Sequence, residues 1–302
     1  MLIVQLMMIG LVAGSFGGML GIGGSLIMIP AMTEVLGPDQ HLYQAAAMIV
    51  NVFVAAPAVY QHRKAGAIEW ATVARMFPIA AVAVVGGVLL SELPVFAGDR
   101  GEPYLRGLFG IMLFALVGYE LFRLLRKAAP KLPFLPRTAT LPSEHDREAT
   151  TRPRSWSFAM VVAVPTGLVA GLMGVGGGAL AVPLQRRFLG LPMRAAIANS
   201  SAVIVATATV GATAKNIAYA ADQAGTTSPF LLAAVLIPTA IVGSLFGSRL
   251  THRLPVRAIK VAFLLFLLVA AIRLTSKAAS QIRSTSTQVR AIPARVALDR
   301  LV

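Results

Sequence analysis

Long stretches without charged residues dominate the chain. Five runs contain no Asp, Glu, Lys, Arg or His: 1–33, 42–61, 155–185, 195–214 and 223–248. Shorter charge-free runs cover 76–91, 107–119 and 261–272. A helix needs about 20 mostly apolar residues to cross a bilayer. The pattern therefore predicts about eight transmembrane segments, with the weakest signals near 107–125 and 258–275.

Composition supports the same class. The chain has 302 residues, of which 57% are hydrophobic and 13% charged, and a soluble protein could not bury that much apolar surface. We do not expect the run 1–33 to be a signal peptide, because it is too long and no Lys or Arg precedes its apolar core. The absence of Cys excludes disulfides, thiol catalysis and Cys-ligated metals.

The net charge of +15 has a topological interpretation. The basic residues lie between apolar segments and in the tail, where Lys and Arg mark cytoplasmic loops and meet anionic lipid headgroups. With eight straight crossings, the basic loop 61–71, the linker, the loop 215–222 and the tail share one face. This arrangement predicts that both termini lie inside the cell. Inverted halves would instead require an odd number of crossings in the first half.

A polar, Pro-rich and basic stretch divides the chain. It cannot span lipid and is typical of a flexible linker. The predicted organisation is a first transmembrane repeat (1–122), a linker (123–154), a second repeat (155–275) and a polar basic tail (276–302). The tail is either disordered or a surface helix.

Each half opens with the same glycine pattern. Gly21-Ile22-Gly23-Gly24-Ser25, with Pro30 beyond, matches Gly174-Val175-Gly176-Gly177-Gly178, with Pro183 beyond. This correspondence predicts an all-α bundle of two homologous four-helix repeats. As one straight helix, residues 1–33 would extend roughly 50 Å, against a hydrocarbon core of about 30 Å. Because clustered glycines weaken a helix, we expect a break in the first helix of each half.

Broken helices at membrane depth point to a binding site. They aim free N–H groups at a cavity, and the N-terminus of a half-helix attracts anions. The candidate site residues are Gly21, Gly23, Gly24, Ser25, Gly174, Gly176, Gly177 and Gly178. The alternative is close packing, for which the spacings Gly14-x-x-x-Gly18 and Gly167-x-x-x-Gly171 are suited.

A polar streak runs along the segment 195–216. Asn199, Ser200 and Ser201 could bind an anion without carrying charge, or could bond to neighbouring helices or back to their own. Thr207, Thr209 and Thr213 extend the streak. Lys215 and Asn216 end it, and Gln61 and His62 take the matching place in the first half. These four residues are candidates for attracting the anion or for coupling protons to transport. Alternatively, the Lys215 side chain could simply extend so that its ammonium lies at the membrane–water interface.

At these motifs the chain resembles the TauE/SafE-type sulfite exporter family, from about Gly10 to Leu274. The segments Gln61–Trp70 and Ala198–Ser201 carry the likeness further. The resemblance implies a plasma-membrane permease for small sulfur-containing anions, such as sulfite and organosulfonates. Two departures predict a lopsided site: Ser25 stands opposite Gly178, and Ala45-Ala46-Ala47 stands opposite Asn199-Ser200-Ser201.

The leading hypothesis is a secondary transporter of a small anion in the cell membrane, presumed from the resemblance to be a bacterial inner membrane. We expect that the protein is not an enzyme and binds no cofactor or metal, because all four His lie in loops or at segment ends and no carboxylate pair falls within an apolar run. Expected partners are the anion, lipids, a coupling proton or sodium ion, no nucleic acid, and a second copy of the chain if it oligomerises. A permease for another organic anion, a channel and a scaffold remain alternatives.

Overall fold

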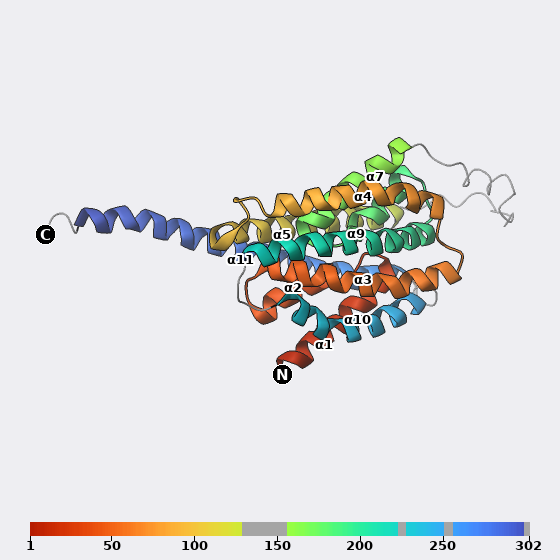
Figure 1. Ribbon diagram of the computed structural model, residues 1–302, viewed down its shortest axis with the longest axis horizontal. Coiled ribbons are helices and arrows are strands. Elements are labelled where there is room, and N and C mark those ends of the chain that lie inside the picture. Colours follow the sequence, from red (N-terminus) through yellow and green to blue (C-terminus); the bar gives the residue numbers. More distant parts are fainter. Residues whose placement is uncertain (129–155, 223–227, 251–255, 299–302) are drawn as a thin grey trace.

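The computed structural model describes residues 1–128, 156–222, 228–250 and 256–298. Within these residues the chain forms ten α-helices and no strand. The first half contains α1 (Leu2–Leu20), α2 (Ser25–Leu36), α3 (Gln40–Lys64), α4 (Trp70–Ser91) and α5 (Gly98–Ala128). The second contains α7 (Trp156–Met173), α8 (Gly178–Phe188), α9 (Met193–Asp222), α10 (Pro229–Leu250) and α11 (Val256–Leu298). Figure 1 shows most of them lying side by side in one bundle.

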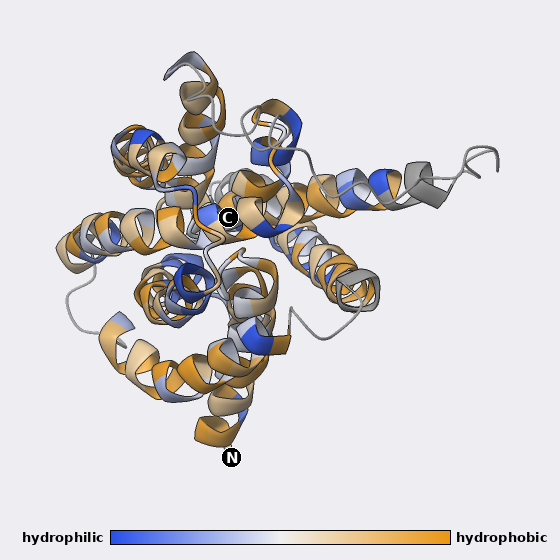
Figure 2. Cartoon of the chain, turned by 90° about the vertical axis from the view of Figure 1, so that its right-hand side faces the viewer, coloured by the Kyte–Doolittle hydropathy of each residue, from blue (hydrophilic) through white to orange (hydrophobic). Residues whose placement is uncertain are grey.

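Eight of the described helices are long and apolar enough to cross a membrane. They include Gly101–Arg123 and Val261–Arg283, which cover the two weakest sequence signals. Large apolar side chains such as Val82 and Phe246 are exposed on the outside of the bundle, where lipid would solvate them. Figure 2 looks along the bundle and shows hydrophobic residues over most of the helices. The predicted polytopic helical bundle is confirmed.

Both predicted helix breaks are present. α1 ends at Gly21, which has a φ of 63°, and α2 begins only at Ser25. In the second half, Gly174 and Gly176 have φ values of 71° and 68° before α8 begins. Residues other than glycine rarely adopt this left-handed backbone conformation, so the glycine clusters end the first helix of each half.

At each break the chain folds back on itself. A Cβ added to Gly24 would lie 3.2 Å from the carbonyl oxygen of Ala13, well back along α1. Likewise, a Cβ on Gly177 would lie 3.0 Å from the carbonyl oxygen of Thr166 in α7. Therefore α1–α2 and α7–α8 are two helical hairpins, each of which begins and ends at one end of the bundle.

The two halves interlock through small residues. α1 packs along α10, where Gly14 and Gly18 lie against Ala240 and Ser244. α7 packs along α4 in the same way, and the backbone around Val84 leaves no room for a Cβ on Gly171. In both pairs the helices run parallel. The packing role expected for the outer glycines is therefore observed, because their missing side chains let two backbones approach.

Corresponding helices of the two halves run in opposite directions. The start of α3 is joined to the end of α9 by His41 and Lys215, while Asn199 near the start of α9 bonds to Glu69 just beyond α3. α5 and α11 are also antiparallel, because Arg106 bonds to Gln281. The halves are thus inverted in space; their descent from one repeated unit stays a prediction.

The inversion corrects the predicted grouping of loops. The turn between α3 and α4 lies at one end of the bundle, here called the linker end, with the end of α5 and the start of α9 (Figure 1). The starts of α1 and α3 and the ends of α4 and α9 form the opposite, terminal end. Placing the loops 61–71 and 215–222 on one face was wrong, because each half has a hairpin and three crossings rather than four straight crossings.

Two helices extend past the predicted repeat boundaries. α5 continues to Ala128, and α11 continues as one helix to Leu298, into the segment expected to be a polar tail. Residues 129–154 of the predicted linker lie outside the described residues. The division into repeats, linker and tail stays a prediction.

Candidate functional site

The two helix breaks meet in the interior of the bundle. A Cβ added to Gly178 at the start of α8 would lie 2.5 Å from the Cα of Ile22 in the first break. Asn51 of α3 lies between the breaks: added Cβ atoms on Gly23 and Gly176 would lie 3.0 Å from its Oδ1 and 2.9 Å from its Nδ2. The structure therefore brings together both predicted glycine clusters, backbone against backbone.

Asn51 caps the first break. Its Oδ1 accepts hydrogen bonds from the backbone N–H groups of Gly24 at 2.9 Å and Ser25 at 3.3 Å. Its Nδ2 donates to the Ser25 hydroxyl at 3.0 Å, and both side chains are fully buried. Two of the N–H groups at the start of α2 are thus satisfied by Asn51. Sequence reasoning missed Asn51, although it is the only amide between Ala45 and Ala58.

Hydroxyls from α9 lie at both breaks. Ser200 donates to the carbonyl oxygen of Gly21 at 2.8 Å, and Thr207 lies 3.2 Å from the carbonyl oxygen of Gly176. The nearest acceptor of the Thr207 hydroxyl is the carbonyl oxygen of Val203 in its own helix, at 3.0 Å. Ser201 bonds back to Ile197 in its own helix, yet its Oγ would lie 3.1 Å from a Cβ on Gly21. Thr209 and Thr213 only bond back to α9, as the alternative interpretation expects.

Asn199 lies apart from the breaks. Its Oδ1 accepts from the backbone N–H of Glu69 at 2.8 Å, so it fastens the turn before α4 to α9 at the linker end. The side chain is fully buried, and its Nδ2 has no hydrogen-bond partner among the described residues. The structure thus separates Asn199 from Ser200 and Ser201, with which it was grouped.

The second break lacks the cap of the first. Gly21, Pro30 and Asn51 correspond in spacing to Gly174, Pro183 and Ile204. Ile204 faces the start of α8, where a Cβ on Gly178 would lie 2.5 Å from its Cδ1. An alkyl side chain cannot accept a hydrogen bond, and no side chain of the described residues accepts from the N–H groups of Gly178 or Ala179. The first-turn N–H groups of α8 therefore carry the chemistry that an anion needs.

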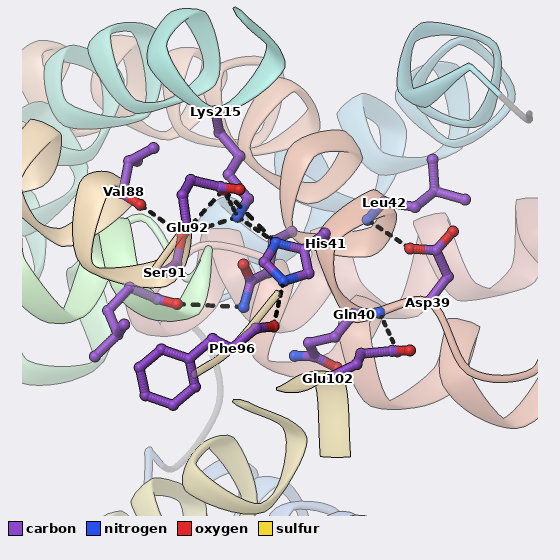
Figure 3. Close-up of polar contacts among 12 residues, drawn as sticks. Asp39, Gln40, His41, Leu42, Val88, Ser91, Glu92, Phe96, Glu102 and Lys215 are labelled. Atoms are coloured by element: carbon purple, nitrogen blue, oxygen red, sulfur yellow. Dashed lines mark hydrogen bonds and ion pairs between the residues drawn. The ribbon is translucent and has the colours of Figure 1, made fainter. Parts of the chain in front are cut away.

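A buried ionic cluster lies at the terminal end (Figure 3). Lys215 of α9 is fully buried and donates to Glu92 at 2.5 Å, to Ser91 at 2.8 Å and to His41 Nδ1 at 2.8 Å. The expectation that Lys215 merely reaches to the interface is wrong, because its ammonium turns inward to these partners. Glu92 and His41 were missed because they are far from Lys215 in sequence.

Glu92 is held in its charged form. It lies just beyond α4, and its side chain is 24% exposed. Burial alone would raise the pKa of this carboxyl, but the hydrogen bond and the positive charge of Lys215 lower it. Glu92 is therefore a carboxylate at neutral pH.

The other coupling candidates are divided between the two ends. Asn216 is beside Lys215, and its Nδ2 donates to the carbonyl oxygen of Ala212 at 2.8 Å. Gln61 and His62 lie near the end of α3, at the linker end, and His62 is buried. The matching places of the two halves thus fall at opposite ends of the bundle, as inversion requires.

The described residues contain no group of three or more His, Cys, Asp or Glu side chains able to hold a metal ion. The cavity beside the breaks, between Leu20, Ile22 and Ala179, measures about 40 Å³ and is mostly apolar, with room for little more than one water molecule. A second, mostly apolar cavity of about 360 Å³ lies along α8, between Met112, Ala179 and Pro183, while the backbone contact of Gly178 with Ile22 closes the space between the breaks in this conformation.

Inverted halves, two broken helices meeting in the interior and polar groups around them define a membrane transporter. The chain belongs to the sulfite exporter TauE/SafE family, which matches residues 6–274. This confirms the resemblance found in the motifs.

Relatives in the family carry general names. The probable membrane transporter protein MamO of Magnetospirillum gryphiswaldense is 30% identical over 277 residues, covering 85% of this chain and 42% of the relative. The probable membrane transporter protein YunE of Bacillus subtilis is 23% identical over 264 residues, covering 85% of this chain and 91% of its own. The chain thus spans less than half the length of MamO. No solved structure matches it.

Proposed function

We propose that this transporter is a secondary permease for a small sulfur-containing anion, such as sulfite or an organosulfonate. The observation that carries the proposal is the uncapped start of α8, buried where the two breaks meet. Backbone N–H groups at a helix N-terminus bind oxyanions without a fixed positive charge. The family name supports a sulfur oxyanion, while the relatives' names leave the cargo open.

Transport requires the two breaks to separate. Gly178 and Ile22 touch through their backbones, so an anion can reach the α8 N-terminus only when they move apart. The inverted arrangement supplies two related bundles, α1 and α3 with α10, and α7 and α9 with α4. We infer that rocking along the α3–α9 contact opens the site alternately to the two ends.

Uptake of labelled sulfite by vesicles carrying the purified protein tests the proposal. Taurine, sulfoacetate, sulfate and lactate serve as competitors, under imposed proton or sodium gradients. Saturable uptake that one sulfur anion blocks supports the proposal. Preferential block by lactate would instead assign another organic anion, non-saturable flux would indicate a channel, and no flux from folded protein would favour a scaffold.

We also propose that the linker end faces the cytoplasm of a bacterial inner membrane. Described basic residues gather there, including Arg63, Lys64, Arg186, Arg187 and Arg194. At the terminal end, Lys215 and Arg106 are buried and paired with carboxylates. There too, the exposed Arg273 and the half-buried Lys277 pair with Glu34, and Arg283 is exposed. Because positive loops stay inside, this proposal places both termini outside, the reverse of the expectation from straight crossings.

The absence of Cys makes this orientation simple to test. In intact cells, a membrane-impermeant thiol reagent should label Val95→Cys at the terminal end and spare Ala65→Cys in the turn after α3. Both positions are exposed, so reactivity differs only by the side they face. The opposite labelling pattern would overturn the orientation.

A further inference from the structure

His41 joins α3 to the ionic cluster as a neutral ring. Its Nε2 lies 3.0 Å from the carbonyl oxygen of Phe96, which can only accept, so Nε2 carries the hydrogen. Its Nδ1 lies 2.8 Å from Lys215 Nζ, which can only donate. The two partners together assign one tautomer, with Nδ1 as an acceptor (Figure 3).

Lys215 has no spare donor in this arrangement. An ammonium has three N–H groups, and three acceptors surround this one: Glu92 Oε1, Ser91 Oγ and His41 Nδ1. The ammonium is fully occupied and shielded from any passing anion.

A proton on His41 would change these partners. With Nδ1 protonated, the ring can no longer accept from Lys215, and the two cations repel each other. Glu92 Oε1 lies 3.6 Å from Nδ1 and is the acceptor within reach of the new N–H. Lys215 then loses its hydrogen bond to His41 and shares the Glu92 carboxylate with the protonated ring, while it remains an ammonium.

The freed ammonium would lie on the route to the breaks. Lys215 follows Thr207 by eight residues along α9, about 12 Å at 1.5 Å per residue. Thr207 touches Gly176 in the second break. A positive charge at this distance draws an anion from the terminal end toward the start of α8.

His41 is accessible to a proton, and few other charged groups lie near it. The His41 side chain is 16% exposed, whereas Lys215 is fully buried. Beyond Glu92 and Lys215, the charged neighbours are Asp39 on α3 and the Glu102–Arg106 pair on α5. Glu102 is occupied by Arg106 and by the backbone N–H of Gln40, so it does not replace Glu92 as the partner of His41.

We propose that His41 is the proton-coupling residue of this transporter. A proton arriving from the terminal end binds Nδ1, draws Glu92 from Lys215 to His41, loosens α3 from α9 and exposes Lys215 to the anion. This proposal rests on the proposed function, and it assigns proton coupling to His41 at the terminal end instead of the predicted candidate His62.

Cysteine accessibility tests the switch without any cargo. Ala45→Cys places a thiol one helical turn behind His41, at a fully buried position whose carbonyl oxygen accepts from Asn216. Thiol reagents attack the thiolate, so their intrinsic rate falls in acid. Rates are therefore normalised to Val95→Cys, a 63% exposed position at the same end.

The normalised rate should rise about tenfold on going from about pH 8 to about pH 6 in the chain with His41, because the proposed proton loosens α3 from α9. His41→Gln should remove the rise, because its amide can still accept from Lys215 but takes up no proton. Glu92→Gln should weaken the rise, because its amide oxygen can still accept a hydrogen bond but no longer carries the negative charge that attracts the protonated ring.

Two controls separate this switch from general loosening. His62→Gln changes the buried histidine of the linker end, and Glu102→Gln breaks the neighbouring ion pair; both should keep the pH response. A flat response with His41 present, or an equal response in His41→Gln, overturns the proposal. A chain that responds in labelling but moves no anion overturns the proposed function instead.

Discussion

The two breaks share left-handed glycines at their first and third positions, but they differ in backbone at Gly24 (φ −87°) and Gly177 (φ 81°) and in what faces them. At the start of α2, the Asn51 amide occupies the N–H groups of Gly24 and Ser25. At the start of α8, the corresponding position is Ile204, which offers no acceptor. One break is closed by the protein's own polar group, and the other keeps its donors. Under the proposed function, the repeated motif serves structure in the first half and anion binding in the second.

A second difference follows from the residue after each glycine cluster. Ser25 carries a side chain that bonds to Asn51, whereas Gly178 has none and lies against the backbone of Ile22. At the first break, the Ser25 side chain is accommodated because it bonds to Asn51 of the same half. At the second break, Gly178 leaves no space for a Cβ because the backbone of Ile22 lies against it.

The largest expected effect comes from copying the first break into the second. In Gly178→Ser the new Cβ would meet Ile22 and Ile204 at 2.5 Å, which forces the two breaks apart. We expect uptake to fall about a hundredfold, because misplaced binding groups lose rate steeply, while the protein still enters the membrane. Gly118→Ala is the matched control, since a Cβ there meets nothing within 4 Å. Normal uptake by Gly178→Ser would disprove the assignment of the site.

The next effect is on stability. Asn51→Leu leaves the N–H groups of Gly24 and Ser25 buried without an acceptor, which should cost about 2–4 kcal/mol. Thermal unfolding in detergent measures the loss. Ile204→Leu at the corresponding position removes no hydrogen bond and should unfold near the wild-type temperature. Equal losses in both variants would mean that the amide has no special role.

A smaller effect is expected from giving the second break a cap. Ile204→Asn puts an amide oxygen where Asn51 lies in the first half, so it should compete with the anion for the start of α8. We expect the KM for uptake to rise about tenfold, with folding retained, the size typical of one charge-assisted hydrogen bond. An unchanged KM would argue that the anion binds elsewhere.

The smallest effect concerns the pH dependence of stability at the end of α9. Because the pKa of Glu92 is lowered from 4.5, its pairing with Lys215 stabilises the fold fully above about pH 4.5. That contribution is lost as pH falls through the lowered pKa. Unfolding temperatures of the wild type and Glu92→Gln should therefore differ at neutral pH and converge in acid. A constant difference down to low pH would contradict the charged pair.

Several features were readable in the sequence. Charge-free runs predicted the membrane helices, because length and apolarity alone decide whether a segment can cross lipid. The glycine clusters predicted the two breaks, since glycine enters the left-handed region without strain. Ser200 and Ser201 were expected near the site, and the structure brings both to Gly21. The family likeness rested on the same motifs and is confirmed.

The tertiary structure alone decided the rest. Whether a broken helix continues across the membrane or folds back depends on contacts such as Gly24 with Ala13, which no local pattern encodes. That choice sets the parity of the crossings and hence the inversion of the halves. The contacts of Asn51 with Ser25 and of Lys215 with Glu92 span 26 and 123 residues. Local sequence determines where helices begin and break, but the partners of buried polar groups are selected only when distant helices pack together.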